Sequence, residues 1–176
     1  MTKLTWTQRL YWRYFSKPVS DRPVLLHLIK TPVSSILEIG IGSATRTKTM
    51  LSLVNLPEGV AQLRYAGVDM FESADDGREH IKLKNAHRML AEKCVRAHLM
   101  PGDLTSALPR LTRTVHPSDL VIIDGGWNTD TQDGHALLQW LPRLASPTAT
   151  VFACSTPGEM LQTITVPQQT TTRQAA

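Results

Sequence analysis

The sequence predicts an α/β fold: a doubly wound, mainly parallel sheet with helices on both faces. Two observations carry this prediction. From residue 33 onward, short β-branched apolar runs alternate with amphipathic stretches, which is typical of a parallel sheet buried on both sides. A turn with two glycines joins the first of these runs to a helical stretch. The 176 residues, 41% of them hydrophobic and 19% charged, are enough for one domain with a sizeable core.

The elements of this sheet can be placed in order along the chain. We expect five strands, at residues 35–39, 63–69, 95–100, 120–124 and 148–154. The stretches between them predict helices at 46–53, 76–93 and 131–144, and a short turn of helix at 104–111. Because crossovers between parallel strands are right-handed, the strand order in the sheet should be 3-2-1-4-5.

Two flanking segments complete the expected organisation. Residues 1–33 are expected to form a helical arm, with an amphipathic helix over 6–15 and a second short helix over 24–30. The aromatic stripe of the first helix either packs against the helices of the sheet or forms a lid. The core follows over 34–155. The tail, 156–176, has room for at most one or two edge strands and ends in a polar segment that we expect to be partly disordered.

Composition excludes several classes of protein. No apolar run approaches the roughly 20 residues that a bilayer span needs. The amino-terminal segment lacks the apolar core of a signal peptide, so we expect a cytoplasmic protein with no membrane partner. Cys94 and Cys154 stand alone, without metal or redox spacing, and are expected to be reduced thiols. The net charge of +4 is small and dispersed, and gives little support to a nucleic-acid partner.

The turn after the first strand carries a carboxylate, Glu38, two residues before the first of its glycines, Gly40 and Gly42. A dinucleotide would bring a pyrophosphate to the start of the following helix, where a partly desolvated carboxylate would repel it. S-adenosylmethionine has no phosphate and carries a sulfonium and an ammonium group, which a carboxylate attracts by water-mediated or direct hydrogen bonding. The turn therefore favours S-adenosylmethionine over a nicotinamide dinucleotide, which remains the third alternative.

These residues resemble the first motif of the class I S-adenosylmethionine-dependent methyltransferases, which has the form acidic-x-Gly-x-Gly-x-small. Glu38, Gly40, Gly42 and Ala44 match its positions, and Ser43 lies within the same loop. The resemblance implies a Rossmann-like fold and a binding site for S-adenosylmethionine that includes these five residues.

The family's other binding segments have matches in the same order. Asp69 ends the second strand, where the family's acidic residue accepts hydrogen bonds from the ribose, and Met70 and Phe71 would lie along the adenine. The alternative for Asp69 is a turn residue at a strand end. Asp103 matches the residue that contacts the adenine amino group, and Leu104 matches the one that packs on the ring.

The fourth strand ends in the segment IIDGGWN, which resembles the family's fourth motif. The resemblance places Asp124 beside the methyl donor, and by analogy makes it the candidate for a general base; no other catalytic residue is implied. In the small-molecule O-methyltransferase branch the segment often continues to a histidine, whereas this chain has Trp127. That side chain either lines a substrate pocket for the methyl acceptor or packs over the loop.

Other polar clusters carry less weight. Asp130, Asp133 and His135 follow the fourth strand, but the fifth strand ends without a carboxylate or amide, so no metal site is expected. Asp130 is expected to cap the following helix. His80 and His87 lie seven residues apart within a predicted helix, a spacing that usually marks a solvated face.

Over about residues 33–155, the resemblance implies an S-adenosylmethionine-dependent methyltransferase whose acceptor is unidentified, with a small molecule as the preferred class. The family usually adds two strands after the fifth, and this chain has room for about one. Three explanations stay open: a shortened enzyme, a homodimer in which the partner covers the sheet edge, or a catalytically inactive binding or scaffold protein. RNA is a weaker alternative partner, through the basic and aromatic arm.

Overall fold

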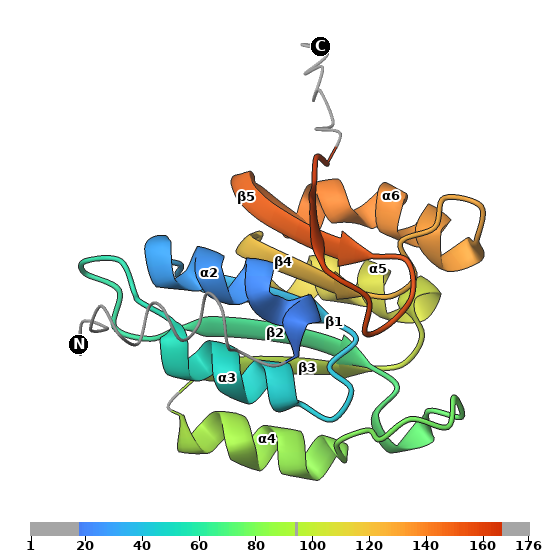
Figure 1. Ribbon diagram of the computed structural model, residues 1–176, viewed down its shortest axis with the longest axis horizontal. Coiled ribbons are helices and arrows are strands. Elements are labelled where there is room, and N and C mark those ends of the chain that lie inside the picture. Colours follow the sequence, from blue (N-terminus) through green and yellow to red (C-terminus); the bar gives the residue numbers. More distant parts are fainter. Residues whose placement is uncertain (1–17, 94, 167–176) are drawn as a thin grey trace.

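The computed structural model describes residues 18–93 and 95–166, which form a six-stranded sheet with helices on both faces (Figure 1). The strands are β1 (Ser35–Ile39), β2 (Arg64–Asp69), β3 (Arg96–Pro101), β4 (Ser118–Asp124), β5 (Ala145–Cys154) and β6 (Gln162–Ile164). The helices are α2 (Arg22–Lys30), α3 (Thr45–Leu53), α4 (Leu83–Glu92), α5 (Leu104–Thr114) and α6 (Gln132–Leu144), with 3-10 turns η1 (Val19–Asp21) and η2 (Phe71–Ser73).

The strand order is β3-β2-β1-β4-β5-β6. The first five strands are parallel, and β6 pairs antiparallel with β5, from Val151 opposite Ile164 to Ala153 opposite Gln162. The predicted order 3-2-1-4-5 and the Rossmann-like class are therefore confirmed, and the one edge strand added within the described residues, β6, agrees with the expected one or two at most.

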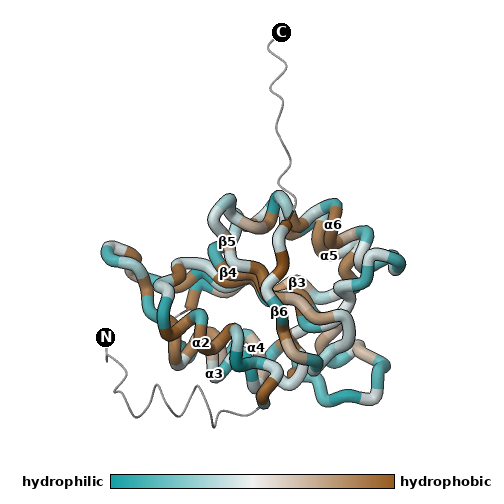
Figure 2. The backbone as a smooth tube through the Cα atoms, turned by 45° about the horizontal axis from the view of Figure 1, so that its top comes forward, coloured by the Kyte–Doolittle hydropathy of each residue, from teal (hydrophilic) through white to brown (hydrophobic). Residues whose placement is uncertain are grey.

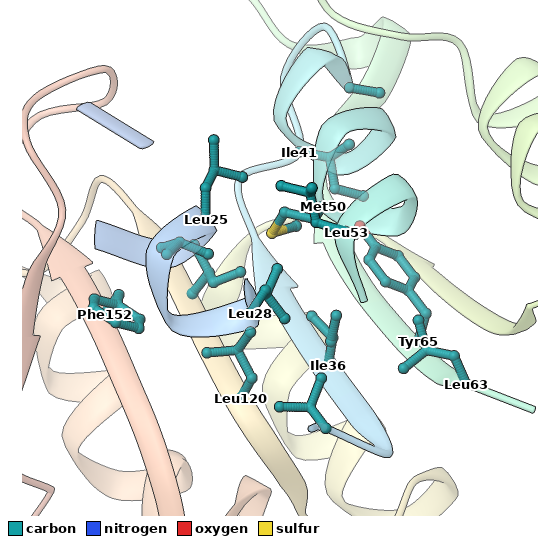
Figure 3. Close-up of a cluster of buried hydrophobic side chains, with 14 of the residues drawn as sticks. Leu25, Leu28, Ile36, Ile41, Met50, Leu53, Leu63, Tyr65, Leu120 and Phe152 are labelled. Carbon is teal, nitrogen blue, oxygen red and sulfur yellow. The ribbon is translucent and has the colours of Figure 1, made fainter. Parts of the chain in front are cut away.

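Alternating side chains of the buried strands supply two separate cores. In β4, Leu120 and Ile122 pack with α2, α3 and α4, whereas Val121 and Ile123 pack with α5 and α6. Figure 2 shows the hydrophobic residues concentrated along the central strands between these helices. Figure 3 shows the first core, where Leu28 of α2 and Met50 of α3 lie over the sheet. The continuous apolar runs of the sequence follow from burial on both faces.

The helix predicted over 76–93 is wrong in its first half, because α4 begins only at Leu83. The Asp76 side chain accepts a hydrogen bond from the backbone N–H of Arg78 at 3.0 Å, and Gly77 has a φ of +71°. Such Asx turns compete with helix formation, so the local turn chemistry prevails over the apolar spacing.

Two further boundaries differ from the prediction. The short turn expected at 104–111 is an eleven-residue helix, α5, and Asp103 caps it by accepting from the backbone N–H of Ser106. Strand β5 begins at Ala145 rather than at residue 148, because α6 runs directly into it. The helix predicted over 24–30 is confirmed as α2. The helix predicted over 6–15 and the polar end of the tail lie outside the described residues.

The β1–α3 turn touches β4, and Gly40 makes this approach possible. It has a φ of +81°, and a Cβ atom added there would lie 2.7 Å from the backbone oxygen of Asp124. Gly59 has the same φ of +81° but nothing within 4 Å of the corresponding position. A comparison of substitutions at the two glycines therefore separates the cost of a left-handed backbone from the cost of a steric clash.

We predict that G40A destabilises the fold more than G59A. Each alanine should cost about 1–2 kcal/mol for its left-handed backbone, and G40A should cost roughly 1–3 kcal/mol more because β4 must shift. Urea unfolding of both variants measures the difference. Equal losses would show that the contact with β4 is easily relieved.

Candidate functional site

Two adjoining cavities open where the strands end at their carboxyl edge. The strand-end cavity, about 250 Å³, lies between the ends of β1, β2 and β4 and the start of α5. The turn cavity, about 290 Å³, lies between the glycine turn, η1 and the loop that follows β5. Four residues line both cavities: Arg78, His80, Asp124 and Pro157. A ligand longer than either cavity could therefore occupy both.

Most of the residues expected from the sequence gather here. The strand-end cavity is lined by Gly40, Asp69, Met70, Asp103, Leu104 and Asp124. The turn cavity is lined by Gly42, Ser43 and Asp124. Four expected site residues line neither cavity: Glu38, Ala44, Phe71 and Trp127.

Glu38 is fully buried, and its two oxygens are held by other side chains of the chain. Arg46 Nε donates to Oε1 at 2.8 Å, and the hydroxyls of Thr47 and Tyr65 donate to Oε2 at 2.8 and 2.6 Å. The carboxylate does meet a cation, as expected, but that cation is Arg46. Of the water-mediated and direct contacts that the sequence left open for Glu38, direct contact with a ligand does not fit this arrangement.

Arg46 links the glycine turn to the end of β4. Its Nη1 donates to Asp124 Oδ2 at 2.8 Å, its Nη2 donates to the Gly40 carbonyl at 2.7 Å, and Asp21 lies 3.5 Å away. Burial opposes the charge of Arg46, but the carboxylates of Glu38, Asp124 and Asp21 outweigh it and raise the pKa of the guanidinium. The guanidinium is therefore a permanent part of the site.

Asp124 is held as an ionised carboxylate. Its Oδ1 accepts from the backbone N–H of Gly158 at 2.8 Å and from the Cys154 thiol at 3.4 Å, while Oδ2 accepts from Arg46. Burial would raise the pKa of Asp124, but Arg46 and the Gly158 N–H lower it below its usual value. A general base works best with a pKa near the operating pH, so this arrangement disfavours that role for Asp124.

Asp69 holds the glycine turn in place. Its Oδ2 accepts from the backbone N–H of Gly42 at 2.9 Å, and its Oδ1 accepts from the backbone N–H of Phe71 at 2.6 Å. His80 Nδ1 lies 3.1 Å from the same Oδ1. A ligand with two hydroxyls could reach this carboxylate fully only after displacing one of these partners.

The spacing of His80 and His87 indicated a solvated helix face, but His80 does not lie on one. It precedes α4, its side chain is only 10% exposed, and its Nε2 lies 3.0 Å from Asp76 Oδ1. Asp76 is also paired with Arg78, and the backbone N–H of Ile81 donates to the Gly42 carbonyl at 2.8 Å. These contacts hold the segment between η2 and α4 against Asp69 and Gly42, beside both cavities.

Two non-glycine residues beside the cavities have left-handed backbone. Ala44 has a φ of 62° and Phe71 a φ of 52°, and both side chains are buried. Such conformations are costly, and they persist where the surrounding contacts impose them. Phe71 packs in the core beside α3, so of the pair expected along an adenine only Met70, 41% exposed, faces the strand-end cavity.

Asp103 and Trp127 have separate environments. Hydrogen bonds from Thr105 and Ser106 lower the pKa of Asp103 to about 2, so its carboxylate at the cavity rim is ionised. Trp127 is partly buried against the core formed by α5 and α6, which supports the packing alternative. Asp130 does not cap α6, because Thr131 accepts from the backbone N–H of Gly134 instead.

The charge of the site is strongly negative. Seven carboxylates line the two cavities: Asp21, Asp69, Asp76, Glu79, Asp103, Asp124 and Asp133. Two guanidiniums, Arg46 and Arg78, line them with one histidine. Within residues 18–93 and 95–166, no group of three metal-ligating side chains has geometry suited to an ion. The site therefore suits a cationic organic ligand and would repel a pyrophosphate.

Arg46 and His80 were not predicted as site residues from the sequence. A signal for Arg46 existed, because a basic residue in the first turn of a helix opposes the helix dipole and calls for a carboxylate partner. For His80 the alternative was visible in the neighbouring Asp76 and Gly77, which are typical turn residues.

The fold is that of S-adenosylmethionine-dependent O-methyltransferases. No protein-family model and no curated protein matches the sequence significantly, but solved structures match the fold. The O-methyltransferase TomG of Streptomyces achromogenes, solved with SAM, matches at a TM-score of 0.52 and 22% identity over 80% of this chain and 56% of its own. The SAH-bound methyltransferase PaMTH1 of Podospora anserina matches at 0.53 and 13%, over 79% and 53%.

The O-methyltransferase of Bacillus cereus, solved with SAH, matches at a TM-score of 0.50 and 19% identity, over 85% of this chain and 56% of its own. This chain thus spans about half the length of these proteins, and the similarity establishes the fold alone. No helix within the described part of the chain is long and apolar enough to cross a membrane.

We predict that R46M destabilises the protein by about 3–5 kcal/mol, because it leaves the buried Glu38 without its charge partner. The double variant E38Q/R46M should be more stable than R46M, since neither charge remains. Thermal and urea unfolding of E38Q, R46M and E38Q/R46M give the coupling energy between the two side chains. R78M, which removes a half-exposed arginine, is the control and should change stability little. A double variant no more stable than R46M would contradict the pairing.

Proposed function

We propose that this protein is an S-adenosylmethionine-dependent methyltransferase acting on a small-molecule acceptor. The observation that carries the proposal is the excess of carboxylates around a glycine turn at the carboxyl edge of a Rossmann-like sheet. Ligands of such sheets bind at this edge. An uncharged adenosine with a sulfonium and an ammonium group suits it, whereas a phosphate does not.

The adenosine half of the donor would occupy the strand-end cavity. Asp69 would accept hydrogen bonds from the ribose hydroxyls, and Asp103 would accept one from the adenine amino group. Met70 and Leu104 would contact the ring. The support is that all four side chains line one cavity beneath the glycine turn.

The amino-acid half would extend past Asp124 into the turn cavity. Its carboxylate is attracted by Arg46, whose side chain lines that cavity, and its ammonium is attracted by Asp21 and Asp124. Asp21 and Arg46 are 3.5 Å apart, so one zwitterionic group could reach both. From the sequence, the ammonium was expected near Glu38, but Arg46 pairs with that carboxylate.

Methyl transfer at this site needs mainly alignment. The acceptor's nucleophile forms a bond to the methyl carbon as the carbon–sulfur bond breaks. The electron pair of the broken bond stays on sulfur, which leaves as a neutral thioether. Alignment of the two reactants supplies about 7–11 kcal/mol in well-oriented intramolecular models. Because Asp124 is held ionised by Arg46, it would stabilise the cationic donor before transfer rather than take the acceptor's proton.

The second candidate is a binding or scaffold protein with this fold and no catalysis. It is favoured by one observation: Arg46 holds Asp124, the candidate general base, as an ionised carboxylate with a lowered pKa. Within the described residues the last strand is β6, three residues long, and a second copy of the chain could pair with it.

We predict that titration calorimetry detects saturable binding of S-adenosylmethionine and of S-adenosylhomocysteine, and no binding of NAD. D69N should weaken both by about tenfold or more, since it replaces a charged acceptor in a buried network. D130N, an exposed carboxylate outside both cavities, is the matched control and should bind normally. Absence of heat with both adenosyl compounds would refute the proposal.

Turnover separates the two candidate functions. The protein is incubated with methyl-labelled donor and a panel of small phenols, amines and acids, and label transfer is counted. Transfer supports the enzyme, whereas tight donor binding with no transfer across the panel supports the binding protein.

We predict that H80A binds S-adenosylmethionine several-fold more tightly than the unaltered protein. His80 occupies one acceptor site of Asp69 that the ribose requires, so removing the imidazole removes a competitor. H87A, which removes an exposed histidine on α4, should leave affinity unchanged. Weaker binding in H80A would instead make His80 part of the ligand's own contacts.

A further inference from the structure

Another cavity lies at the opposite edge of the sheet, where the strands begin. It measures about 220 Å³ and is lined by the starts of β1, β2, β3 and β4, by the last residue of α5 and by the residues that follow it. Four of its lining side chains are basic or imidazole groups: Arg64, Arg96, His98 and His116. No carboxylate lines it. We call it the basic cavity.

The two arginines of the basic cavity are direct neighbours. Arg64 of β2 is paired in register with Arg96 of β3, so both side chains leave the same face of the sheet. Like charges directly across a strand pair are unfavourable. In the described part of the chain, neither guanidinium has a carboxylate within 4.0 Å.

Asp119, whose pKa the charge of Arg64 helps to lower, is already hydrogen-bonded to Ser34. Asp119 accepts from the backbone N–H and the hydroxyl of Ser34 at 2.9 and 2.6 Å. Burial would raise the pKa of Asp119, but the hydrogen bonds from Ser34 and Ser35, and then the charge of Arg64, lower it. Arg64 is thus only partly balanced, and Arg96 is exposed at the rim.

The end of α5 does not account for this positive charge. Basic side chains often interact with the last carbonyls of a helix, and the basic residue in the last turn of α5 is Arg113. Thr112 and Thr114 donate to carbonyls within the helix, those of Pro109 at 2.8 Å and of Arg110 and Leu111 at 3.3 and 3.1 Å. The guanidiniums of Arg64 and Arg96 instead line the cavity.

We propose that the basic cavity binds a small ligand through a single phosphate group. Two adjacent guanidinium forks match the oxygens of a phosphate dianion, and His116 can add a donor at the wall. His98 also lines the cavity, but its Nε2 lies 3.2 Å from Thr114 Oγ1. A volume of 220 Å³ is below the ~300–1,000 Å³ typical of drug-sized ligands, which limits the occupant to inorganic phosphate or a small phosphomonoester. A nucleic-acid strand would need exposed aromatic platforms, and the one phenylalanine, tyrosine or tryptophan lining the cavity, Tyr65, is only 1% exposed.

The basic cavity is distinct from the donor site. Arg64 begins β2 and Asp69 ends it, so at ~3.3 Å per residue the two sites are separated by roughly 17 Å. Phosphate and an adenosyl compound should therefore bind independently.

The probe is inorganic phosphate, titrated into the protein at constant ionic strength set with chloride and followed by ³¹P NMR and calorimetry. We expect saturable binding at one site, which R64Q/R96Q weakens by about tenfold or more, and unchanged phosphate affinity when S-adenosylhomocysteine is present. K48Q/R88Q removes two exposed charges on α3 and α4 outside this cavity and is the charge-matched control. Circular dichroism and thermal unfolding check that both double variants fold.

Several outcomes would overturn the proposal. They are the absence of saturable binding, an equal loss of affinity in K48Q/R88Q, or full retention of affinity in R64Q/R96Q. Competition between phosphate and S-adenosylhomocysteine would place the anion in the donor site instead. Binding of a short single-stranded RNA more tightly than phosphate, lost in R64Q/R96Q, would replace the small ligand by a nucleic acid.

Discussion

The buried ion pair between Arg46 and Glu38 is the interaction on which the rest of the site depends. Neither charge could remain in the interior alone, because desolvation of an unpaired ion costs several kcal/mol. Paired, they fasten the end of β1 to the first turn of α3, and the second arm of the guanidinium reaches Asp124 at the end of β4. Both sides of the glycine turn are thereby fixed, with Gly40 so close to β4 that a Cβ atom there would lie 2.7 Å from the backbone oxygen of Asp124.

This pair changes the electrostatic argument that starts from the sequence. A carboxylate before the glycine turn attracts a cation, and that physical expectation holds, but the chain itself supplies the cation. The preference of the site for a positively charged ligand comes instead from carboxylates on other strand ends, of which Asp69 and Asp124 are the most buried that reach a cavity. A positively charged ligand remains the expectation, although Glu38, from which that expectation was drawn, lines neither cavity.

The sequence predicts the sheet better than it predicts the site. Strands buried on both faces are visible as continuous apolar runs, and the strand order follows from crossover handedness. The site depends on pairs that no local pattern reveals: Arg46 and Asp124 are 78 residues apart. The error before α4 has another cause, because Asp76 and Gly77 form a turn that overrides helical spacing. That turn is what places His80 against Asp69.

The two edges of the sheet carry opposite charge beyond what the helix dipoles balance. Five helices, α2, α3, α4, α5 and α6, start at the carboxyl edge and contribute roughly +0.5 each, or about +2.5. The seven carboxylates and two guanidiniums there leave five negative charges, so an excess of roughly two to three remains. At the basic cavity, the charges of Arg64 and Arg96 exceed the roughly −0.5 at the end of α5, which lines that cavity. A ligand of opposite charge would balance each excess, so a cation is expected at the carboxyl edge and an anion at the basic cavity.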